Sequence, residues 1–496
     1  MGIVISIDAG TTGVRAMAVD ETGQPAGWSY REFTQHFPQP GWVEHDAEEI
    51  WSTVQDTLAD LTDELTAPVA AIGITDQRET VVAWDRRTGM PRHRAIVWQD
   101  RRTAPQCSEL EASGHLDVVR ERTGLVLDPY FSATKLRWLI DHGGVDDDQH
   151  LAVGTIDSWL IWKLTDGEVH ATDPSNASRT LLYDIGELAW SEELIELFGV
   201  PGLALPEVFP SSGRFGLTAD TTALGAGIPV SGVAGDQQAA LFGQACFRPG
   251  MTKNTYGTGS FVLMNVGESC PDPIDGVLTT VAWTIPSPTG GTVTHYALEG
   301  SIFATGAAVQ WLRDGLGIID AASDLEELAL RCDHTDGVVL VPAFTGLGSP
   351  WWDPQARGTL IGITRGTGRP QIARAVVDAM VHQTRDVVDA MCAGSGRRVE
   401  ALRADGGASA MDLLIQLQAD QLGVPVTRPA HQETTALGAA YLAGLAEGVW
   451  SSLDEIETHW TIDLDAAPQL DRATADAEHD LWLRAVERSR GWASHA

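Results

Sequence analysis

Lysine is almost absent from this chain. Only Lys135, Lys163 and Lys253 occur among 496 residues, arginine supplies nearly all of the positive charge, and the formal net charge is −35. Such a surface repels the phosphate backbone of DNA and RNA, which excludes nucleic acid as a general partner. An acidic, lysine-poor surface is typical of proteins that work at raised salt, but a codon bias towards arginine produces the same composition, and the sequence fits both.

Patterned cysteines and long apolar runs are also missing. The five cysteines are scattered, odd in number and without the spacing of a metal site, which argues against a disulfide framework and fits reduced thiols. No apolar run approaches the roughly 18 residues that a membrane span needs, and no basic segment precedes an apolar one near the first residue. We therefore expect a cytoplasmic protein without a membrane span.

The length and composition predict two packed domains. A chain of 496 residues exceeds what one hydrophobic core usually serves. Hydrophobic residues make up 43% of it, and no low-complexity segment or long linker interrupts the apolar pattern, which argues against disorder. We expect two packed domains of roughly 250 residues each.

The first candidate site is a tight turn near the N-terminus. Residues 4–10 predict an apolar strand that carries Asp8 near its end, and residues 15–23 predict a second strand. The turn between them, Gly10–Gly13, offers backbone N–H groups and two threonine hydroxyls, which suit phosphate oxygens, while Asp8 is placed to hold water on Mg²⁺. An ordinary hairpin turn produces the same pattern.

A second candidate site combines an arginine, a glutamate and a tryptophan. Residues 70–80 predict a strand with Arg78 and Glu79 at its polar end, and the strand predicted at 95–102 presents Trp98. A guanidinium donates to hydroxyls, a carboxylate accepts from them, and an indole covers carbon, so the three suit a small polyol. A surface ion pair beside a core tryptophan is the alternative.

A third candidate lies at residues 231–245, where an apolar strand meets Gly235 and a helix-like segment follows. Junctions of this kind leave backbone N–H groups unpaired and aim one side chain over a cleft. Asp236 can therefore act as a base toward a substrate hydroxyl. The alternative is that Asp236 only caps the helix.

Segments along nearly the whole chain resemble the FGGY family of carbohydrate kinases. The run Tyr130, Ser132, Lys135 and Trp138 is similar to the first signature of that family, and residues 358–378 are similar to the second. Four further segments resemble, more narrowly, the members of the family that phosphorylate glycerol. They are GWVEHD (41–46), DQRET (76–80), NTYGTG (254–259) and VPAFTGLGSPWWDP (341–354).

The resemblance implies both a fold and a reaction. The fold is α/β, with two ribonuclease H-like domains of the actin-like ATPase kind, over residues 1–245 and 246–496, and a catalytic cleft between them. The second domain repeats the strand-turn-strand unit of the first at residues 253–266, around Gly257–Gly259. The reaction is transfer of the γ-phosphoryl group of ATP, with Mg²⁺, to glycerol, giving sn-glycerol 3-phosphate. The partners are the small molecules glycerol and ATP, and the assembly is a homodimer or homotetramer.

The resemblance also assigns residues position by position. The catalytic base is Asp236. The polyol is bound by Arg78, Glu79, Trp98, Tyr130, Asp236, Gln237 and Phe261. The nucleotide is bound by Thr11, Thr12, Gly13, Arg15, Thr258, Gly306, Gln310, Gly407 and Met411, the last standing where the glycerol-phosphorylating members usually have asparagine. The metal is held near Asp8 and Asp236.

Two other functions remain open at this stage. One is a kinase of the same family for another polyol or sugar. The other is a non-metabolic ATPase of the same fold, such as a chaperone or a filament protein. A chaperone needs a peptide-binding region beyond the ATPase core, and a filament protein has no use for a polyol pocket, so the first alternative is the stronger.

Overall fold

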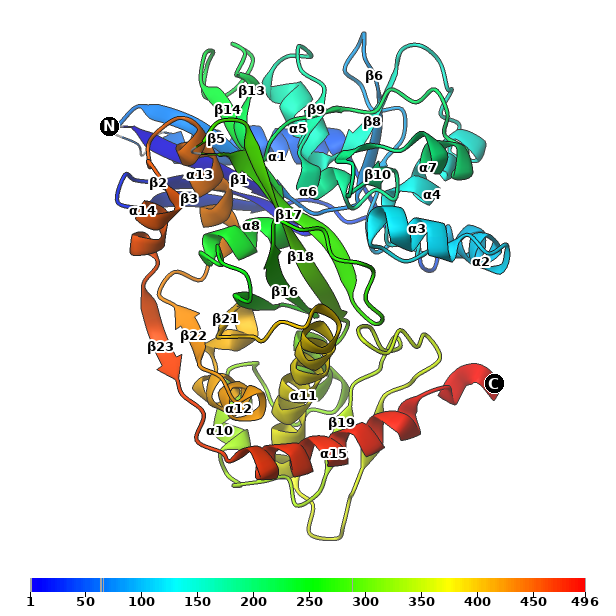
Figure 1. Cartoon of the computed structure of the whole chain (residues 1–496), viewed down its shortest axis with the longest axis vertical. Helices are drawn as coiled ribbons and strands as arrows, with labels where there is room; N and C mark the ends of the chain where they lie inside the picture. The colour runs from blue at the N-terminus through cyan, green and yellow to red at the C-terminus, as the bar shows by residue number, and fades with distance from the viewer. Residues whose placement is uncertain (1, 63–64, 66, 288, 496) are drawn as a thin grey trace.

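Two twisted β-sheets organise the chain. The computed structural model describes residues 2–62, 65, 67–287 and 289–495. In Figure 1 one sheet occupies the upper part of the view and the other the lower part, with the long strands β17 (Leu278–Pro286) and β18 (Thr292–Ile302) running through the middle.

The first sheet has six strands in the order β13-β14-β5-β1-β2-β3. Their bounds are β1 Ile3–Ala9, β2 Gly13–Val19, β3 Pro25–Glu32, β5 Val69–Asp76, β13 Ser212–Leu217 and β14 Pro229–Gly235. β1 pairs antiparallel with β2, while β1, β5 and β14 are parallel. The register sets Ala9 and Gly235 beside Asp76, so the three parallel strands finish together at one edge. Asp8, Arg78 and Asp236 belong to that edge.

The second sheet repeats this arrangement. Its order is β17-β18-β16-β15-β21-β22-β23. Its other strands are β15 Thr252–Tyr256, β16 Ser260–Gly267, β21 Leu402–Asp405, β22 Val426–Pro429 and β23 Ile462–Ala466. β15 pairs antiparallel with β16 and parallel with β21, which is parallel to β22. The strands β15, β16, β18, β21 and β22 therefore match β1, β2, β3, β5 and β14 in order and direction.

Two helices connect the sheets. α8 (Asp236–Gly243) follows β14 directly, and α13 (Thr434–Ala446), although late in the chain, packs against α8, β5 and β14 of the first sheet (Figure 1). The sequence of α13 is apolar on all sides, and most of its residues are buried, as expected for a helix enclosed by its neighbours. α8, which joins β14 of the first sheet to β15 of the second, therefore packs against both sheets.

The remaining helices cover the faces and ends of the sheets. They are α1 Ala47–Thr62, α2 Ala104–Ala112, α3 Leu116–Thr123, α4 Ser132–Asp141, α5 Ile156–Leu164, α6 Pro174–Ala177, α7 Glu192–Leu197, α9 Gly306–Gln310, α10 Asp324–Ala329, α11 Arg369–Ser395, α12 Asp412–Leu422, α14 Leu453–His459 and α15 Arg472–Ser489, with short π and 3₁₀ turns at Trp311–Gly315, Gly407–Ala410 and Trp492–His495. Short strands complete smaller sheets at β4 Glu44–His45, β6 Val81–Asp85, β7 Ala95–Ile96, β8 Leu151–Thr155, β9 Ala171–Thr172, β10 Tyr183–Asp184, β11 Ala189–Trp190, β12 Glu207–Val208, β19 Val339–Val341 and β20 Thr359–Ile361.

Most of the elements expected from sequence are present, and the differences lie at their ends. The apolar spacing after Asp46 predicts a helix up to about residue 65. Asp46 caps α1 through hydrogen bonds from the N–H groups of Glu48 and Glu49, but α1 ends at Thr62, and residues 63 and 64 of the expected helix lie outside the described residues. The strand expected at 95–102 is ordered as a strand only over β7. The sequence of residues 301–316 predicts a helix throughout, but the helix begins at Gly306 because β18 continues to Ile302.

Within the described ranges, no helix is long and apolar enough to cross a membrane.

Candidate functional site

Asp236 is the first residue of α8, at the edge where the parallel strands of the first sheet end. Gly235 occupies the N-cap position, so the interpretation of Asp236 as the cap is wrong. A Cβ on residue 235 would lie 2.6 Å from side-chain carbons of Arg78, and glycine is required because the arginine lies across it. The Asp236 carboxylate forms an ion pair with Nε of Arg78 at 3.1 Å and is about one-third exposed. It is held from one side and open on another, as a base for a substrate hydroxyl must be.

Arg78 and Glu79 follow β5 and are both buried. Each side chain is only 1% exposed, so the alternative of a surface ion pair is wrong. Glu79 has φ 61°, a left-handed backbone conformation that costs energy for a residue other than glycine and is often found at functional sites.

The strained backbone of Glu79 is held by two residues of the first family signature. Its carbonyl oxygen accepts hydrogen bonds from Oγ of Ser132 at 3.1 Å and from Nζ of Lys135 at 3.3 Å. Nζ of Lys135 also donates to the carbonyl oxygens of Tyr130 and Phe131, and burial lowers the pKa of Lys135 to about 8. These contacts give Ser132 and Lys135 a structural role in placing Glu79.

Aromatic side chains close one side of the group. The rings of Trp98 and Tyr130 meet edge to face at 5.5 Å, and the Tyr130 hydroxyl accepts from Arg78 at 3.3 Å. Nε1 of Trp98 donates to the hydroxyl of Thr11 at 2.9 Å. The candidate polyol residues are therefore in direct contact with the first hairpin turn.

The second sheet contributes the opposite side. Phe261 on β16 lies 5.8 Å from the guanidinium of Arg78. Gln237 accepts a hydrogen bond from Nζ of Lys253 on β15, which also donates to Thr255 at 2.9 Å. Burial lowers the pKa of Lys253 to about 8. Lys253 was not among the residues predicted for the site, although a lysine inside a strand of so lysine-poor a chain was a usable signal.

Asp8 and Arg15 are partners across the first hairpin. Their Cα atoms are paired in the β1–β2 register. Burial raises the pKa of Asp8 to about 7, Arg15 acts in the opposite direction, and the charge of Asp236 raises the pKa further. A divalent cation beside Asp8 and Asp236 would reverse this effect on Asp8, so the pair of carboxylates fits such an ion. Among the described residues no three His, Cys, Asp or Glu side chains are grouped to hold a metal, so phosphate oxygens and water would complete the shell of Mg²⁺.

Arg15 already has a partner in this structure. Its guanidinium forms an ion pair with Glu433, just before α13, and lies 5.7 and 5.8 Å from the rings of Trp28 and Tyr30. The carboxylate of Glu433 is about half exposed, and ion pairs of that kind contribute little. Donation from Arg15 to a phosphate remains a prediction, and it requires exchange of this partner.

The second hairpin turn, Gly257–Gly259, joins the candidate nucleotide residues through backbone contacts. The N–H of Gly306 donates to the carbonyl of Gly257 at 3.0 Å, and that of Ala307 to the carbonyl of Thr258 at 2.9 Å. A Cβ on Gly406 would lie 2.6 Å from the carbonyl oxygen of Tyr256, whereas one on Gly407 would meet nothing within 4 Å. The turn after β21 is therefore packed against β15 on one side and open on the other.

Met411 and Gln310 differ in their surroundings. Met411 precedes α12 and is buried in the core cluster that contains Tyr256 and Leu414. Its exposed fraction of 9% leaves little of the side chain for contact with an adenine ring. Gln310 is exposed at the end of α9.

The chain matches two domains of one known protein family. Residues 3–243 match the N-terminal domain of the FGGY family of carbohydrate kinases, and residues 252–447 match the C-terminal domain. The chain belongs to the FGGY family of carbohydrate kinases.

Relatives of this FGGY kinase are similar over their full length. A glycerol kinase of Carboxydothermus hydrogenoformans is 52% identical over 99% of the chain and 98% of its own length. A glycerol kinase of Symbiobacterium thermophilum is 54% identical over 99% of both. This similarity makes the chain a kinase, and therefore an enzyme.

Solved structures agree on the fold. A Plasmodium falciparum glycerol kinase with ADP superposes with a TM-score of 0.92 at 35% identity, over 99% of this chain and 98% of that one. A xylulose kinase of Lactobacillus acidophilus, at 21% identity and a TM-score of 0.87, shares the fold. The prediction of two ribonuclease H-like domains is confirmed, while the division of the FGGY kinase at residues 245 and 246 stays a prediction.

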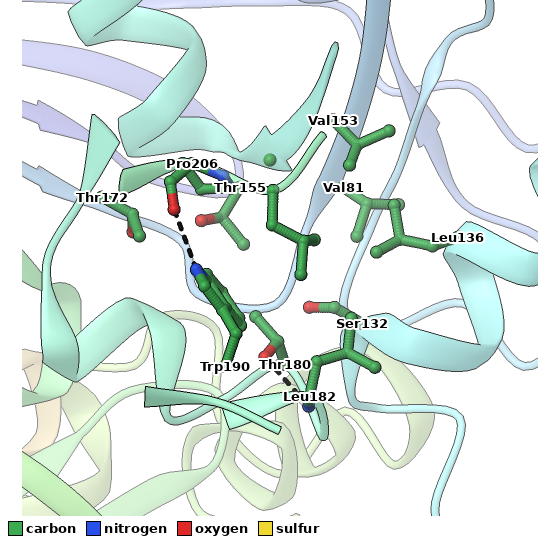
Figure 2. Close-up of a pocket in the computed structure, with 12 residues that line it drawn as sticks. Val81, Ser132, Leu136, Val153, Thr155, Thr172, Thr180, Leu182, Trp190 and Pro206 are labelled. Atoms are coloured by element: carbon green, nitrogen blue, oxygen red, sulfur yellow. Dashed lines mark hydrogen bonds between the residues drawn. The ribbon is translucent and has the colours of Figure 1, made fainter. Parts of the chain in front are cut away.

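A small cavity lies apart from the candidate site of the kinase. It has a volume of about 20 Å³ and is lined by residues of β6, α4, β8 and the segment from 180 to 206. Figure 2 shows Val81, Val153 and Leu136 on one side and Trp190 on another, with Nε1 of Trp190 bonded to the carbonyl of Pro206 at 2.9 Å. It has room for about one water molecule, and no candidate site residue lines it.

Asp76, at the end of β5, is a buried residue of the kinase with only one of its two carboxylate oxygens hydrogen-bonded among the described residues. Nδ2 of Asn176 donates to its Oδ1 at 3.0 Å, whereas its Oδ2 has no hydrogen-bond partner among the described residues. Burial raises the pKa of Asp76 well above 3.8, and the charges of Asp157 and Asp236 add to the effect. The folded state therefore keeps a proton that the unfolded state releases, and stability is lost as the pH rises above 3.8 toward the raised pKa.

We expect Asp76→Asn to stabilise the kinase at alkaline pH. Asparagine keeps the shape and cannot ionise, so it removes the cost of a buried, half-satisfied carboxyl, about 1–3 kcal/mol. Thermal melts at pH 5.5 and 8.5 measure the effect: the Tm of the variant should exceed that of the wild type at pH 8.5, and the difference should shrink at pH 5.5. Asp454→Asn, on the exposed first turn of α14, is the control. A difference that is the same at both pH values contradicts the prediction.

Proposed function

We propose that the kinase transfers the γ-phosphoryl group of ATP to a primary hydroxyl of glycerol, giving sn-glycerol 3-phosphate. The observation that carries the proposal is the contact of Arg78 with both Asp236 and Tyr130 at the end of β5, beside the first hairpin turn. This group offers a base, a cationic donor and an aromatic wall to a molecule with three hydroxyls. The similarity to glycerol kinases at 52–54% identity over nearly the full chain supports the same substrate.

Asp236 takes the proton of the attacking hydroxyl. Its open side leaves room for the substrate, and the ion pair with Arg78 fixes the orientation of the carboxylate. Glu79 accepts hydrogen bonds from other hydroxyls, because only its Oε1 is engaged by protein within the described residues. Donation from Arg78 to a hydroxyl of the substrate requires exchange of one of its present partners, such as the Tyr130 hydroxyl or Asp236.

The two hairpin turns are placed to hold the phosphates of ATP. Backbone N–H groups at Gly10–Gly13 and Gly257–Gly259, with the hydroxyls of Thr12 and Thr258, donate to the phosphoryl oxygens. When Mg²⁺ is bound, Asp8 and Asp236 would hold it, and its charge offsets the negative charge of the phosphates. Gly306, Gln310 and Gly407 would contact the nucleoside, with only the small exposed part of Met411 beside them.

The few polar partners of the pocket favour a three-carbon substrate. The ring of Trp98 meets that of Tyr130, the ring of Phe261 lies 5.8 Å from the guanidinium of Arg78, and both rings cover carbon without offering further acceptors. A pyranose ring carries more hydroxyls than this group has hydrogen-bonding side chains to meet.

Glycerol should therefore exceed pentoses and hexoses in kcat/KM by at least about 100-fold, which is roughly 3 kcal/mol of transition-state discrimination. The measurement is a coupled assay of ADP release with glycerol, xylulose, gluconate and erythritol at saturating MgATP. Comparable kcat/KM with xylulose or gluconate would assign the chain to another kinase of the family. Absence of ADP release with every polyol and sugar would favour a non-metabolic ATPase.

The cellular setting remains a prediction. We predict a cytoplasmic location, since the proposed reaction consumes ATP. A homodimer or homotetramer is also predicted, and sedimentation of the purified protein measures it.

A further inference from the structure

Two residues of the candidate polyol pocket, Arg78 and Glu79, belong to a group of four buried charges. The side chains of Arg78, Arg179, Glu79 and Glu299 are each 0–1% exposed, and we call them the buried quartet. Two arginines and two glutamates give the quartet no net charge, which is what burial of ions requires. Arg179 and Glu299 were not among the residues predicted for the site.

Glu299 holds Arg78 in a fork. Its Oε2 lies 2.5 Å from Nη1 of Arg78, and its Oε1 lies 3.2 Å from Nη2. The remaining Nη protons of Arg78 point to Oε1 of Gln238 at 3.2 Å and to the hydroxyl of Tyr130 at 3.3 Å. With both Nη groups fixed in this way, the third nitrogen, Nε, faces Asp236.

Arg179 links Glu299 to Glu79 through hydrogen bonds. Its Nη2 donates to Oε1 of Glu299 at 2.8 Å, and its Nε donates to Oε1 of Glu79 at 2.7 Å. Its guanidinium also lies 5.7 and 5.3 Å from the rings of Tyr130 and Phe131. One oxygen of Glu299 therefore accepts from both arginines, and the positions of Arg78 and Glu79 both depend on it.

Glu299 belongs to a different sheet from the residues that it holds. It lies on β18, where it is paired in register with Leu263 of β16 and Leu278 of β17. Arg78, Glu79 and Asp236 follow strands of the first sheet. The orientation of the pocket arginine is thus set from the second sheet.

We propose that Glu299 is the positioning residue of the polyol pocket, holding Arg78 toward Asp236 directly and Glu79 toward the substrate through Arg179. The inference rests on the proposed function, since it assigns the pocket to a polyol. Glu299 itself is fully buried behind Arg78 and acts through it. The quartet is therefore part of the substrate-recognition geometry as well as of the core.

The test is Glu299→Gln in the full-length enzyme. Glutamine keeps the length and one acceptor but loses the charge and one acceptor of the fork, so Arg78 is free to shift. Displacement of a substrate-positioning group by about 1 Å costs on the order of 10²-fold in rate, and we expect kcat/KM for glycerol to fall by about 100-fold. The KM for MgATP should stay within about twofold, because the nucleotide residues lie on other segments; a purely structural role would impair both substrates alike.

Glu457→Gln is the matched control. Glu457 also holds an arginine in a fork, with Arg248 at 2.6 and 2.7 Å, but this pair is at the surface and away from the site. It should leave both kinetic constants for glycerol unchanged.

A second variant, Glu299→Asp, tests the inference if Glu299→Gln folds poorly. Glu299→Asp keeps the charge balance of the quartet but is one methylene shorter, so its carboxylate is set back from Arg78 and does not reach both Nη groups at the present distances. It should fold and lose glycerol kcat/KM to a smaller extent, about 10-fold, again with KM for MgATP retained. Full glycerol activity in either variant, or an equal loss for glycerol and MgATP per folded molecule, would overturn the inference. If the wild type does not phosphorylate glycerol at all, it is the proposed function that fails.

Discussion

Asp236→Asn should lower kcat for glycerol phosphorylation by about 10²–10⁴-fold, the range that a positioned general base contributes. Asparagine has the shape of aspartate and keeps an oxygen for Nε of Arg78 and the N–H of Gln237, the two groups now bound to the carboxylate. It cannot accept the proton of the attacking hydroxyl. Binding of glycerol depends on several other residues, so KM for glycerol should change far less than kcat.

The measurement is steady-state kinetics at saturating MgATP, with free Mg²⁺ held constant because Asp236 is also a predicted metal neighbour. Asp454→Asn, an aspartate on the exposed first turn of α14, is the matched control and should be as active as the wild type. A kcat within about threefold of the wild type in Asp236→Asn would rule out Asp236 as the base.

Gly438→Ala should be strongly destabilising. Gly438 lies on α13, and a Cβ there would fall closer than 3.0 Å to the carbonyl oxygen of Ala239 on α8. Gly243 of α8 faces the backbone of Thr434 and Gly438 in the same way, so the two glycines lie against each other where the helices touch. Backbone on both sides cannot yield as a side chain would, and we expect a loss of about 3 kcal/mol in the free energy of unfolding.

Activity should fall with stability in this variant, because α8 begins at Asp236 and a shift of the helix displaces the base. Urea unfolding and kcat on the same preparation measure both. Gly366→Ala is the control: an added Cβ would have only the Thr364 hydroxyl nearby, at 3.8 Å, and stability should be unchanged. Equal stability of Gly438→Ala and the wild type would show that α8 and α13 separate at little cost.

The local parts of the site could be predicted because their signals are local. An apolar strand, a glycine and an acidic residue at the start of a helix are adjacent in sequence, and β14 with α8 formed where expected. The strand-turn-strand pattern around Asp8 and that around Thr258 are likewise complete within about 20 residues, and both hairpins formed. Short-range hydrogen bonding and side-chain periodicity decide such elements, and both can be read from the sequence.

Glu299 and Arg179 could not be found in the same way. Arg78 is separated from Glu299 by 221 residues, and Arg179 from Glu299 by 120. A single charged residue within an apolar strand or after a short helix indicates only that a partner must exist, because an unpaired buried ion is too costly. Lys253 lies on β15, and its partner Gln237 lies on α8, so its role was hidden for the same reason.

The sequence by itself determined the family, the two repeated strand-turn-strand units and the identity of Asp236, Arg78 and Glu79 as candidate site residues, since each depends on neighbours within a short segment. Only the tertiary structure decided that Arg78 and Glu79 are buried, that Gly235 caps α8, that Arg15 is paired with Glu433, and that Glu299 reaches them from the second sheet. Burial and charge pairing arise when distant segments pack together, and no local pattern specifies which buried cation meets which buried anion.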